Sequence, residues 1–475
     1  MTEHLDSRTD RFTRGRVVIV GASLAGLRTA EALRQEGFTG ALTLIGDEPH
    51  LPYDRPPLSK QVLAGRLPVE HTPLARLHDL EASWRCGVPA VGLSLADGHV
   101  LLADGQHVPF DRLIIATGAR ARPWLHPAEA ALDGVLLLRT RDDASRLRAR
   151  LAAGSPRVLI IGGGFIGAEV ASVCRALDLR VTVVERGPAP LAGALGTVVG
   201  SIAAAVQRDH GVDLRCDTTV TTLEGDADGR LRRVHLSDGD TLDVDVALVA
   251  IGPLRNTEWL AGSGLAADPR GVVCDAFCRA IDERGEIQER VFVAGDVARW
   301  PHPLYPDELL SVEHWSNAVA QARTVAQNLV HGPAAYRAHT HLPSFWSHQF
   351  GINIKSAGVP ALADQVLITQ GSVDDRRFVA AYGLGGRLIA AVTFNQARML
   401  PVYQALIEAS APLPIDFKAS DRPSDTRPLP AGFPAAPQPS PTMAAPTRSR
   451  AEHAATSAMA MEHAASRTSL TSDAG

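Results

Sequence analysis

Two glycine-rich turns are the part of this sequence best suited to binding a phosphorylated ligand. Residues 21–26 read GASLAG after the apolar run 16–20, and residues 162–167 read GGGFIG after the apolar run 158–161. In such a turn the first glycine permits a sharp bend, a small central residue lets the backbone approach a pyrophosphate, and the following helix donates its free amides. Ser23 stands at the middle glycine position of the first turn. The second turn has the full GxGxxG pattern, so Gly162, Gly164 and Gly167 are predicted to hold a dinucleotide.

An acidic residue follows each turn at the end of the next apolar run. Glu185 lies 23 residues after Gly162, a spacing that suits a carboxylate bound to a ribose diol. Because an anionic side chain there would repel a 2′-phosphate, we expect NAD rather than NADP, although Arg186 beside it weakens the preference. In the first unit Gly46 occupies the corresponding position and Asp47 follows, so Asp47 could hold an adenosine ribose.

A proline-rich segment just beyond the first unit carries an unusual lysine. Residues 52–60 read PYDRPPLSK, and we expect a stiff loop from which Lys60 projects. The whole chain has only two other lysines, Lys355 and Lys418, and otherwise uses arginine. A lysine at this point therefore indicates a need for a compact ammonium rather than a planar guanidinium.

The elements that must position these residues occur twice along the chain. Each turn is predicted to join a strand to a helix and a second strand, followed by a hairpin with an Asp-Gly turn and an apolar strand ending in glycine. A whole repeated unit is stronger evidence than one motif, so we predict two related nucleotide-binding domains. The predicted elements are 16–20, 24–37, 41–45, 99–105 and 113–118 in the first unit, and 158–161, 166–177, 181–184, 234–239 and 247–252 in the second.

The remainder of the chain is predicted to contain one further domain and a tail. A strand at 290–294 leads into Gly295-Asp296, a helix is expected over 312–330, and short strands with glycine turns fill 336–418. After residue 418 the sequence is rich in Pro, Ala, Ser and Thr without apolar periodicity, which predicts disorder over 419–475.

Composition limits the class of protein and its compartment. The 475 residues include 47 basic and 52 acidic side chains, a net charge of −5 that argues against a nucleic-acid binder. The five scattered cysteines do not suggest a disulfide framework and fit a reducing compartment. The polar start of the chain shows no signal peptide, and no apolar run could span a bilayer. We therefore expect a cytoplasmic protein without a membrane partner.

Taken in order, these motifs resemble the FAD-dependent pyridine-nucleotide ferredoxin reductases. That family includes putidaredoxin reductase, rubredoxin reductase and the reductase components of aromatic-ring dioxygenases. The resemblance covers about residues 15–418 and rests on the two glycine turns and on five further segments. Those segments are PPLSK at 56–60, ATG at 116–118, AGD at 294–296, VEHWSNA at 312–318 and FWSHQ at 345–349.

The resemblance implies an α/β fold with two Rossmann-like dinucleotide-binding domains of the glutathione-reductase type and a C-terminal α+β domain. The implied FAD-binding domain comprises 15–123 and 251–335, and the NAD-binding domain comprises 124–250. Residues 336–418 would form the C-terminal α+β interface domain. Residues 1–14 would be a flexible N-terminus, and 419–475 the disordered tail.

The resemblance also implies roles for particular residues. Lys60 would lie near flavin N5 and pair with Glu169, and these two are the candidate catalytic residues. Asp296 would accept a hydrogen bond from the ribityl chain, and Phe165 would gate or stack on the nicotinamide. Trp315 would start a helix whose positive end faces the flavin pyrimidine, and Trp346 would pack beside the flavin, although a purely structural role for both tryptophans is equally open. Further implied cofactor contacts are Gly21, Ser23, Ala25 and Gly26 at the FAD pyrophosphate, Asp47 at its ribose, Val91 and Arg139 on the adenine side, and Arg55, Thr117, Gly118 and Gly252.

The cysteines narrow the electron acceptor. Disulfide reductases of this fold have a CxxxxC motif where this chain has 56–60, and no cysteine stands there. Cys274 and Cys278 are expected to be ordinary thiols, with no metal site. Electrons must then leave from the flavin itself, so we predict an NADH-dependent reductase of a two-iron ferredoxin that supplies a monooxygenase or dioxygenase. Two alternatives stay open: an NADH oxidase or diaphorase, and an NADH-sensing flavoprotein resembling apoptosis-inducing factor.

Overall fold

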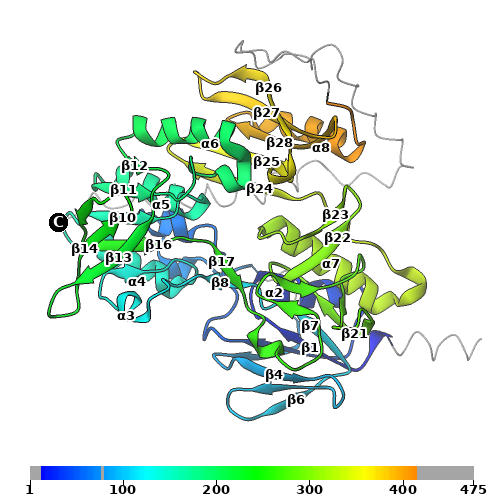
Figure 1. Ribbon diagram of the computed structural model, residues 1–475. Coiled ribbons are helices and arrows are strands. Elements are labelled where there is room, and N and C mark those ends of the chain that lie inside the picture. Colours follow the sequence, from blue (N-terminus) through cyan, green and yellow to red (C-terminus); the bar gives the residue numbers. More distant parts are fainter. Residues whose placement is uncertain (1–11, 76–79, 414–475) are drawn as a thin grey trace, which may run out of the picture. The chain divides into compact units, whose positions relative to one another are not determined.

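The first unit of the fold is a six-stranded, mostly parallel sheet. The computed structural model describes residues 12–75 and 80–413 (Figure 1). The strand order is β20-β21-β7-β1-β2-β3, with only the β20–β21 pair antiparallel. Helices α2 (Leu24–Gln35) and α7 (Trp315–His331) pack against each other beside this sheet, where both bury apolar side chains. The strands are β1 (Arg16–Val20), β2 (Ala41–Gly46), β3 (Ala82–Cys86), β7 (Arg112–Ile115), β20 (Arg279–Ile281) and β21 (Ile287–Val293).

The second unit repeats this arrangement around a five-stranded parallel sheet. Its strand order is β12-β11-β10-β16-β9, and every pair in it is parallel. The strands are short, β-branched and buried on both faces, as parallel sheets require. The strands are β9 (Val135–Leu136), β10 (Val158–Ile161), β11 (Val181–Val184), β12 (Asp213–Arg215) and β16 (Val246–Val249), and the helices are α3 (Pro127–Ala130), α4 (Arg141–Leu151), α5 (Phe165–Ala176) and α6 (Ala192–Asp209).

Smaller sheets complete these units. The chain passes from the first unit to the second along β8 (Ala119–Ala121) and returns along β17 (Pro253–Arg255), and these two strands pair with each other. The other small strands are β4 (Ala90–Ser94), β5 (His99–Leu102) and β6 (His107–Pro109) in one sheet, β13 (Val220–Gly225), β14 (Leu231–Leu236) and β15 (Thr241–Asp243) in a second, and β18 (Ala267–Asp268), β19 (Gly271–Val273), β22 (Ala298–His302) and β23 (Tyr305–Leu310) in a third. The strand pairs of these smaller sheets are antiparallel except for β19 and β22, which pair in parallel.

The third unit is an antiparallel sheet with one helix. The strand order is β24-β25-β28-β27-β26, and α8 (Leu400–Glu408) packs on β25 and β28 through the buried Tyr403, Leu406 and Ile407. The strands are β24 (Ser344–Gln349), β25 (Ile352–Gly358), β26 (Gln365–Ser372), β27 (Arg377–Leu384) and β28 (Arg387–Phe394). Short helical turns complete the chain: η1 (Leu58–Val62), η2 (Val69–His71), η3 (Glu258–Leu260), η4 (Pro333–Ala335), η5 (Pro360–Leu362) and η6 (Ala397–Met399).

The predicted fold class is confirmed: two parallel α/β units are followed by an α+β unit. The predicted domain boundaries stay a prediction. The N-terminus 1–11 and the tail 419–475 lie outside the described residues. No helix in the described ranges is long and apolar enough to cross a membrane.

Two local expectations were wrong. The helix predicted over 312–330 begins only at Trp315, because His314 is extended and its ring accepts a hydrogen bond from the Ser316 amide, which caps the helix. The segment around Lys60 is not a loop but the π-helical turn η1, in which the Val62 amide bonds the Pro57 carbonyl. Such wide turns are rare and often mark functional sites.

Candidate functional site

A cavity of about 640 Å³ gathers most of the predicted site residues. It begins at the carboxyl ends of β1 and β2 and is also lined by residues from β24 and from the start of α5. Its size is within the range of small-molecule and cofactor sites. The predicted residues that line it are Gly21, Ser23, Ala25, Asp47, Arg55, Lys60, Thr117, Gly118, Arg139, Phe165, Glu169, Asp296, Trp315 and Trp346.

The first glycine turn forms part of the wall of this cavity. Gly21 has φ +119°, and a Cβ there would lie 2.0 Å from the Ala116 carbonyl oxygen, so only glycine fits. Gly26 does not line the cavity; a Cβ on it would lie 1.9 Å from the Gly21 carbonyl oxygen, so its role is close packing of α2 on the turn. Within the described chain the Ser23 side chain makes no capping hydrogen bond, which leaves amides at the start of α2 available to an anion.

The second glycine turn has the same backbone design, and its glycines do not line the cavity, whereas Phe165 and Ile166 of the same turn do. A Cβ on Gly162 would lie 2.4 Å from the Ala250 carbonyl oxygen, and one on Gly167 would lie 2.1 Å from the Gly162 carbonyl oxygen. The Glu185 carboxylate accepts hydrogen bonds from the amides of Gly163 and Gly187, each at 2.7 Å. Both oxygens of Glu185 are therefore fixed by backbone beside this turn. Gly164 and Gly252 are likewise absent from the lining of the cavity.

Lys60 and Glu169 meet at the wall of the cavity. Lys60 projects from η1 and Glu169 from α5, and their Nζ and Oε2 atoms are 2.6 Å apart. The same oxygen accepts a hydrogen bond from Ser59, and the other carboxylate oxygen accepts one from Ser347. The Glu169 side chain is only 5% exposed, so its charge is largely removed from water. The ion pair and hydrogen bonds to these partners offset the desolvation cost.

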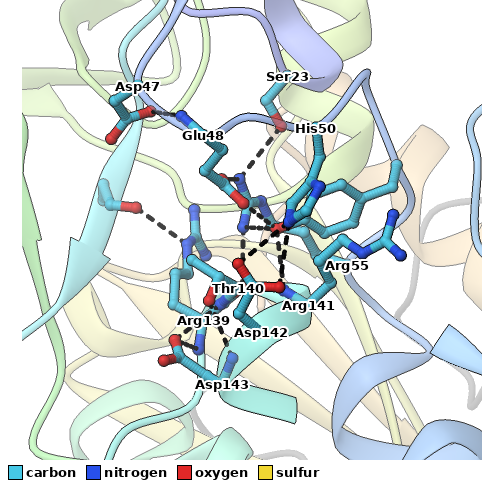
Figure 2. A network of polar contacts seen from close by, with 12 residues as sticks. Ser23, Asp47, Glu48, His50, Arg55, Arg139, Thr140, Arg141, Asp142 and Asp143 are labelled. Atoms are coloured by element: carbon cyan, nitrogen blue, oxygen red, sulfur yellow. Dashed lines mark hydrogen bonds and ion pairs between the residues drawn. The ribbon is translucent and has the colours of Figure 1, made fainter. Parts of the chain in front are cut away.

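Arg55 lies in a second polar network between the glycine turn and Arg139 (Figure 2). Its guanidinium donates to Glu48 Oε1 at 2.5 Å, to the Tyr53 hydroxyl at 2.9 Å and to the Arg139 carbonyl at 2.8 Å. Burial on its own would lower the pKa of Arg55, but Tyr53 and Glu48 outweigh it and the pKa is raised. Arg55 is therefore held as a fixed cation near Ser23, at 3.5 Å.

Arg139 and Asp296 form an ion pair at 2.8 Å on the same side of the cavity. Arg139 also donates to the Ala119 carbonyl at 2.9 Å, which fixes its guanidinium plane.

The resemblance implied that Arg139 and Val91 both contact the adenine side of FAD. Val91 instead lines a second, smaller cavity, which Asp47 and Thr117 also line. Asp47 lines both cavities and so stands between them.

Aromatic side chains form another part of the wall of the main cavity. Trp315, at the first position of α7, donates its indole N–H to Asp54 at 3.2 Å, and Trp346 in β24 is 41% exposed. The rings of Trp346 and His314 meet edge to face at 4.3 Å, and those of Phe165 and Phe345 meet at 4.5 Å. Burial lowers the pKa of His314 to about 4, so this ring is neutral at neutral pH. Burial also raises the pKa of Asp54, against the opposing effects of Trp315, Arg28 and Lys60.

The cysteines do not contribute to the site. None of the residues that line the main cavity is a cysteine. Cys274 and Cys278 are buried, and burial raises the pKa of both thiols. Among the described residues no group of His, Cys, Asp and Glu could hold a metal ion.

Sequence reasoning missed Glu48, Tyr53, Ser59 and Ser347. Tyr53 and Ser59 stand inside the segment that was singled out for Lys60, and Glu48 directly follows Asp47, so proximity along the chain was the available signal. Ser347 lies 178 residues from Glu169, and nothing in the sequence indicates that they meet.

Two mainly parallel sheets, each with a glycine turn that joins a central strand to a helix, define a protein with two dinucleotide-binding units. Comparison with known families agrees. Residues 15–322 match the pyridine nucleotide-disulphide oxidoreductase model, and residues 344–429 match the reductase C-terminal model. The chain belongs to the pyridine nucleotide-disulphide oxidoreductase family, whose members use FAD and NAD(P)H.

Similarity to individual proteins shows which reductases this chain resembles. Rhodocoxin reductase of Rhodococcus erythropolis is 37% identical over 400 residues, which cover 84% of this chain and 90% of the relative. Putidaredoxin reductase of Pseudomonas putida is 33% identical over 417 residues, covering 84% and 95%. The solved structure of the covalent putidaredoxin reductase–putidaredoxin complex matches with a TM-score of 0.78 and 30% identity, covering 84% of this chain and 94% of the matched one.

Proposed function

We propose that this protein takes hydride from NADH onto bound FAD and delivers single electrons to a two-iron ferredoxin. The observation that carries the proposal is one cavity whose lining combines the Lys60–Glu169 pair, the glycine turn at Gly21 and several aromatic side chains, with no cysteine. The names of the relatives support it, since they include a reductase solved in complex with putidaredoxin and the ferredoxin–NAD(+) reductase subunit of a benzene 1,2-dioxygenase system.

The lining of the cavity suits FAD along its whole length. The turn at Gly21 and the open start of α2 would bind the pyrophosphate, with Arg55 as the nearby cation. Asp47 would bind the adenosine ribose, and Asp296, oriented by Arg139, would accept from the ribityl chain. The remaining cofactor contacts would come from Ser23, Ala25, Val91, Thr117 and Gly118.

Around the flavin the chain's own residues would orient the reactants and place charge. FAD, when bound, accepts two electrons as hydride and can release them one at a time. The Lys60 ammonium, fixed by Glu169, would place a positive charge beside flavin N5, and the start of α7 at Trp315 would place its helix dipole by the pyrimidine. Phe165 would position the nicotinamide, and Trp346 would pack beside the flavin.

The second glycine turn would hold NADH. Gly162, Gly164, Gly167 and Gly252 would form the backbone cradle, and Glu185 would accept from the adenosine ribose hydroxyls. Because two amides fix the Glu185 carboxylate, it could not swing away from a 2′-phosphate, which supports a preference for NADH over NADPH.

The domain organisation and the compartment belong to the same proposal. The FAD-binding domain would comprise 15–123 and 251–335, the NAD-binding domain 124–250 and the interface domain 336–418, which agrees with the strands of the three main sheets. A cytoplasmic location is supported by the five cysteines, which form no disulfide in the described structure.

Cytochrome c reduction by NADH, measured with and without a two-iron ferredoxin, tests the proposal. Oxygen consumption is followed in parallel with the purified protein. We expect cytochrome c reduction to depend on the ferredoxin, with little oxygen uptake in its absence. Rapid oxygen uptake without a carrier would instead indicate an oxidase or diaphorase. Slow turnover with NADH-dependent self-association would indicate a sensor.

A further inference from the structure

The carboxylate of Glu169 joins three separate segments of the chain. Glu169 comes from α5 in the second unit, Ser59 and Lys60 come from η1 in the first, and Ser347 comes from β24 in the third. The side chain of Ser347 is 1% exposed, so its hydroxyl is shielded from water like the carboxylate it contacts. This one carboxylate is therefore a shared contact of all three units.

The partners of Glu169 are divided between its two oxygens. Oε2 accepts from Lys60 Nζ at 2.6 Å and from Ser59 Oγ at 2.5 Å. Oε1 accepts only the Ser347 hydroxyl, at 2.7 Å, among the described contacts. Removal of that hydroxyl would leave one oxygen of a buried anion without a donor and would free the carboxylate to rotate.

The Ser347 hydroxyl is itself oriented. Gln349 Nε2 donates to Ser347 Oγ at 3.2 Å and so occupies one of its lone pairs. A hydroxyl has a single proton to donate, and with Gln349 as donor that proton is directed to Glu169. Gln349 thus donates to Ser347 and Ser347 donates to Glu169, while Lys60 donates to the other oxygen of the same carboxylate, so the hydrogen bonds converge on Glu169 at the cavity wall.

Strand β24 is attached to α5 independently of Ser347. The Phe345 ring packs on Phe165 at 4.5 Å, and the Phe350 amide donates to Ser172 Oγ at 2.7 Å. These contacts flank Ser347 on both sides along the chain. Loss of the hydroxyl therefore need not detach the strand, and a specific effect on Glu169 can be separated from a general one.

We propose that Ser347 is a positioning residue that holds the Glu169 carboxylate so that the Lys60 ammonium stays fixed at the reactive end of the cavity. The inference rests on the proposed function, because it takes that end of the cavity to hold the flavin. Ser347 touches no reacting atom and acts through Glu169 on Lys60. The charge that it steadies would favour the reduced, anionic form of the cofactor over the oxidised form.

The midpoint potential of the bound FAD tests the proposal in the holoenzyme. In Ser347→Ala we expect the equilibrium ratio of reduced to oxidised FAD to fall about tenfold. This factor corresponds to the free energy of one hydrogen bond to a charged group. For a two-electron couple, tenfold corresponds to about 30 mV, so the potential should become more negative by that amount. Ser347→Thr keeps the hydroxyl and should restore the potential. The rate of flavin reduction by NADH should fall in Ser347→Ala while the NADH concentration for half-saturation stays unchanged.

Ser356→Ala is the matched control. Ser356 lies in the neighbouring strand β25, is fully buried, and within the described residues its hydroxyl has no hydrogen-bond partner. Its removal should leave the potential unchanged. Equal shifts in Ser347→Ala and Ser356→Ala would mean a merely structural role and would overturn the proposal.

A double-substitution cycle separates action through Lys60 from other effects. In a Lys60→Met background, Ser347→Ala should change the potential no further, and full additivity would refute the assigned route. If Ser347→Ala does not fold, Ser347→Cys, which keeps a weak donor, takes its place and should give a smaller shift in the same direction. A wild-type potential in the Ser347 variants of an enzyme that still reduces ferredoxin would overturn this inference alone. A wild-type protein that binds no FAD would overturn the proposed function itself.

Discussion

Substitution of Gly26 or of Gly167 should disrupt one binding unit at a time, because each glycine packs a helix against the turn of its own unit. Neither residue lines the main cavity, yet a Cβ on Gly26 would lie 1.9 Å from the Gly21 carbonyl oxygen, and one on Gly167 would lie 2.1 Å from the Gly162 carbonyl oxygen. Real Cβ atoms stay at least 3.0 Å away, so helix and turn must separate by about 1 Å in each alanine variant, a displacement that can change function about a hundredfold. The clash is with backbone, which cannot rotate away.

Gly26→Ala should therefore lose FAD, and Gly167→Ala should keep FAD but bind NADH poorly. The assays are the FAD-to-protein ratio after gel filtration and the NADH dependence of flavin bleaching without oxygen. We expect Gly26→Ala to fall well below one FAD per chain, and Gly167→Ala to stay yellow with half-saturation raised about a hundredfold. Gly193→Ala is the control, because Gly193 lies in α6 and a Cβ there would meet nothing within 4 Å. If both test variants behaved like Gly193→Ala, or if Gly167→Ala lost FAD while Gly26→Ala kept it, the assignment of one cofactor to each turn would be wrong.

Three further substitutions test other parts of the site. Arg55→Ala should weaken FAD binding about tenfold or more, since it removes the fixed cation beside Ser23 and the ion-pair partner of Glu48; unchanged FAD retention on dilution would contradict this. Glu185→Ala should narrow the ratio of kcat/KM for NADH over NADPH, and an unaltered ratio would count against a ribose contact. Burial lowers the pKa of His339 to about 3, whereas a histidine in the unfolded chain has a pKa of about 6.5. Below about pH 6.5 the unfolded state therefore gains a proton that the folded state does not. The free energy of unfolding falls as the pH falls, by about 2 kcal/mol at pH 5. In His339→Gln the loss of unfolding free energy between pH 7 and pH 5, measured by urea denaturation, should be smaller by about that amount, and an identical loss would show that His339 is not kept neutral.

The glycine turns could be predicted from the sequence because much of their requirement for glycine arises within the turn itself. Gly21 and Gly162 have a positive φ, which favours glycine. Gly26 and Gly167 lie against the carbonyl oxygens of Gly21 and Gly162, five residues earlier. Both requirements therefore appear in the sequence as glycines at a fixed spacing. The repeated order of strand, turn and helix then predicted the two parallel sheets. The structure adds that Gly26 and Gly167 act by packing, outside the cavity.

Contacts between distant segments could not be predicted in the same way. Ser347 meets Glu169 across 178 residues, and no spacing rule connects a serine in a strand to a carboxylate in a helix. The π-helical turn at Lys60 escaped prediction because its prolines indicate stiffness without specifying the hydrogen-bond pattern. The apolar pattern alone placed the start of α7 too early, because the helix depends on a side-chain cap from His314, an uncommon capping residue; the family resemblance placed the start correctly at Trp315.

Anaerobic mixing of the purified protein with NADH, followed at the visible absorption of the flavin, tests the central claim most directly. The account predicts a protein that is yellow as purified and bleaches rapidly with NADH, more slowly with NADPH, and regains its colour when an oxidised two-iron ferredoxin is added. A protein that contains no FAD, or whose flavin NADH fails to reduce, would contradict it.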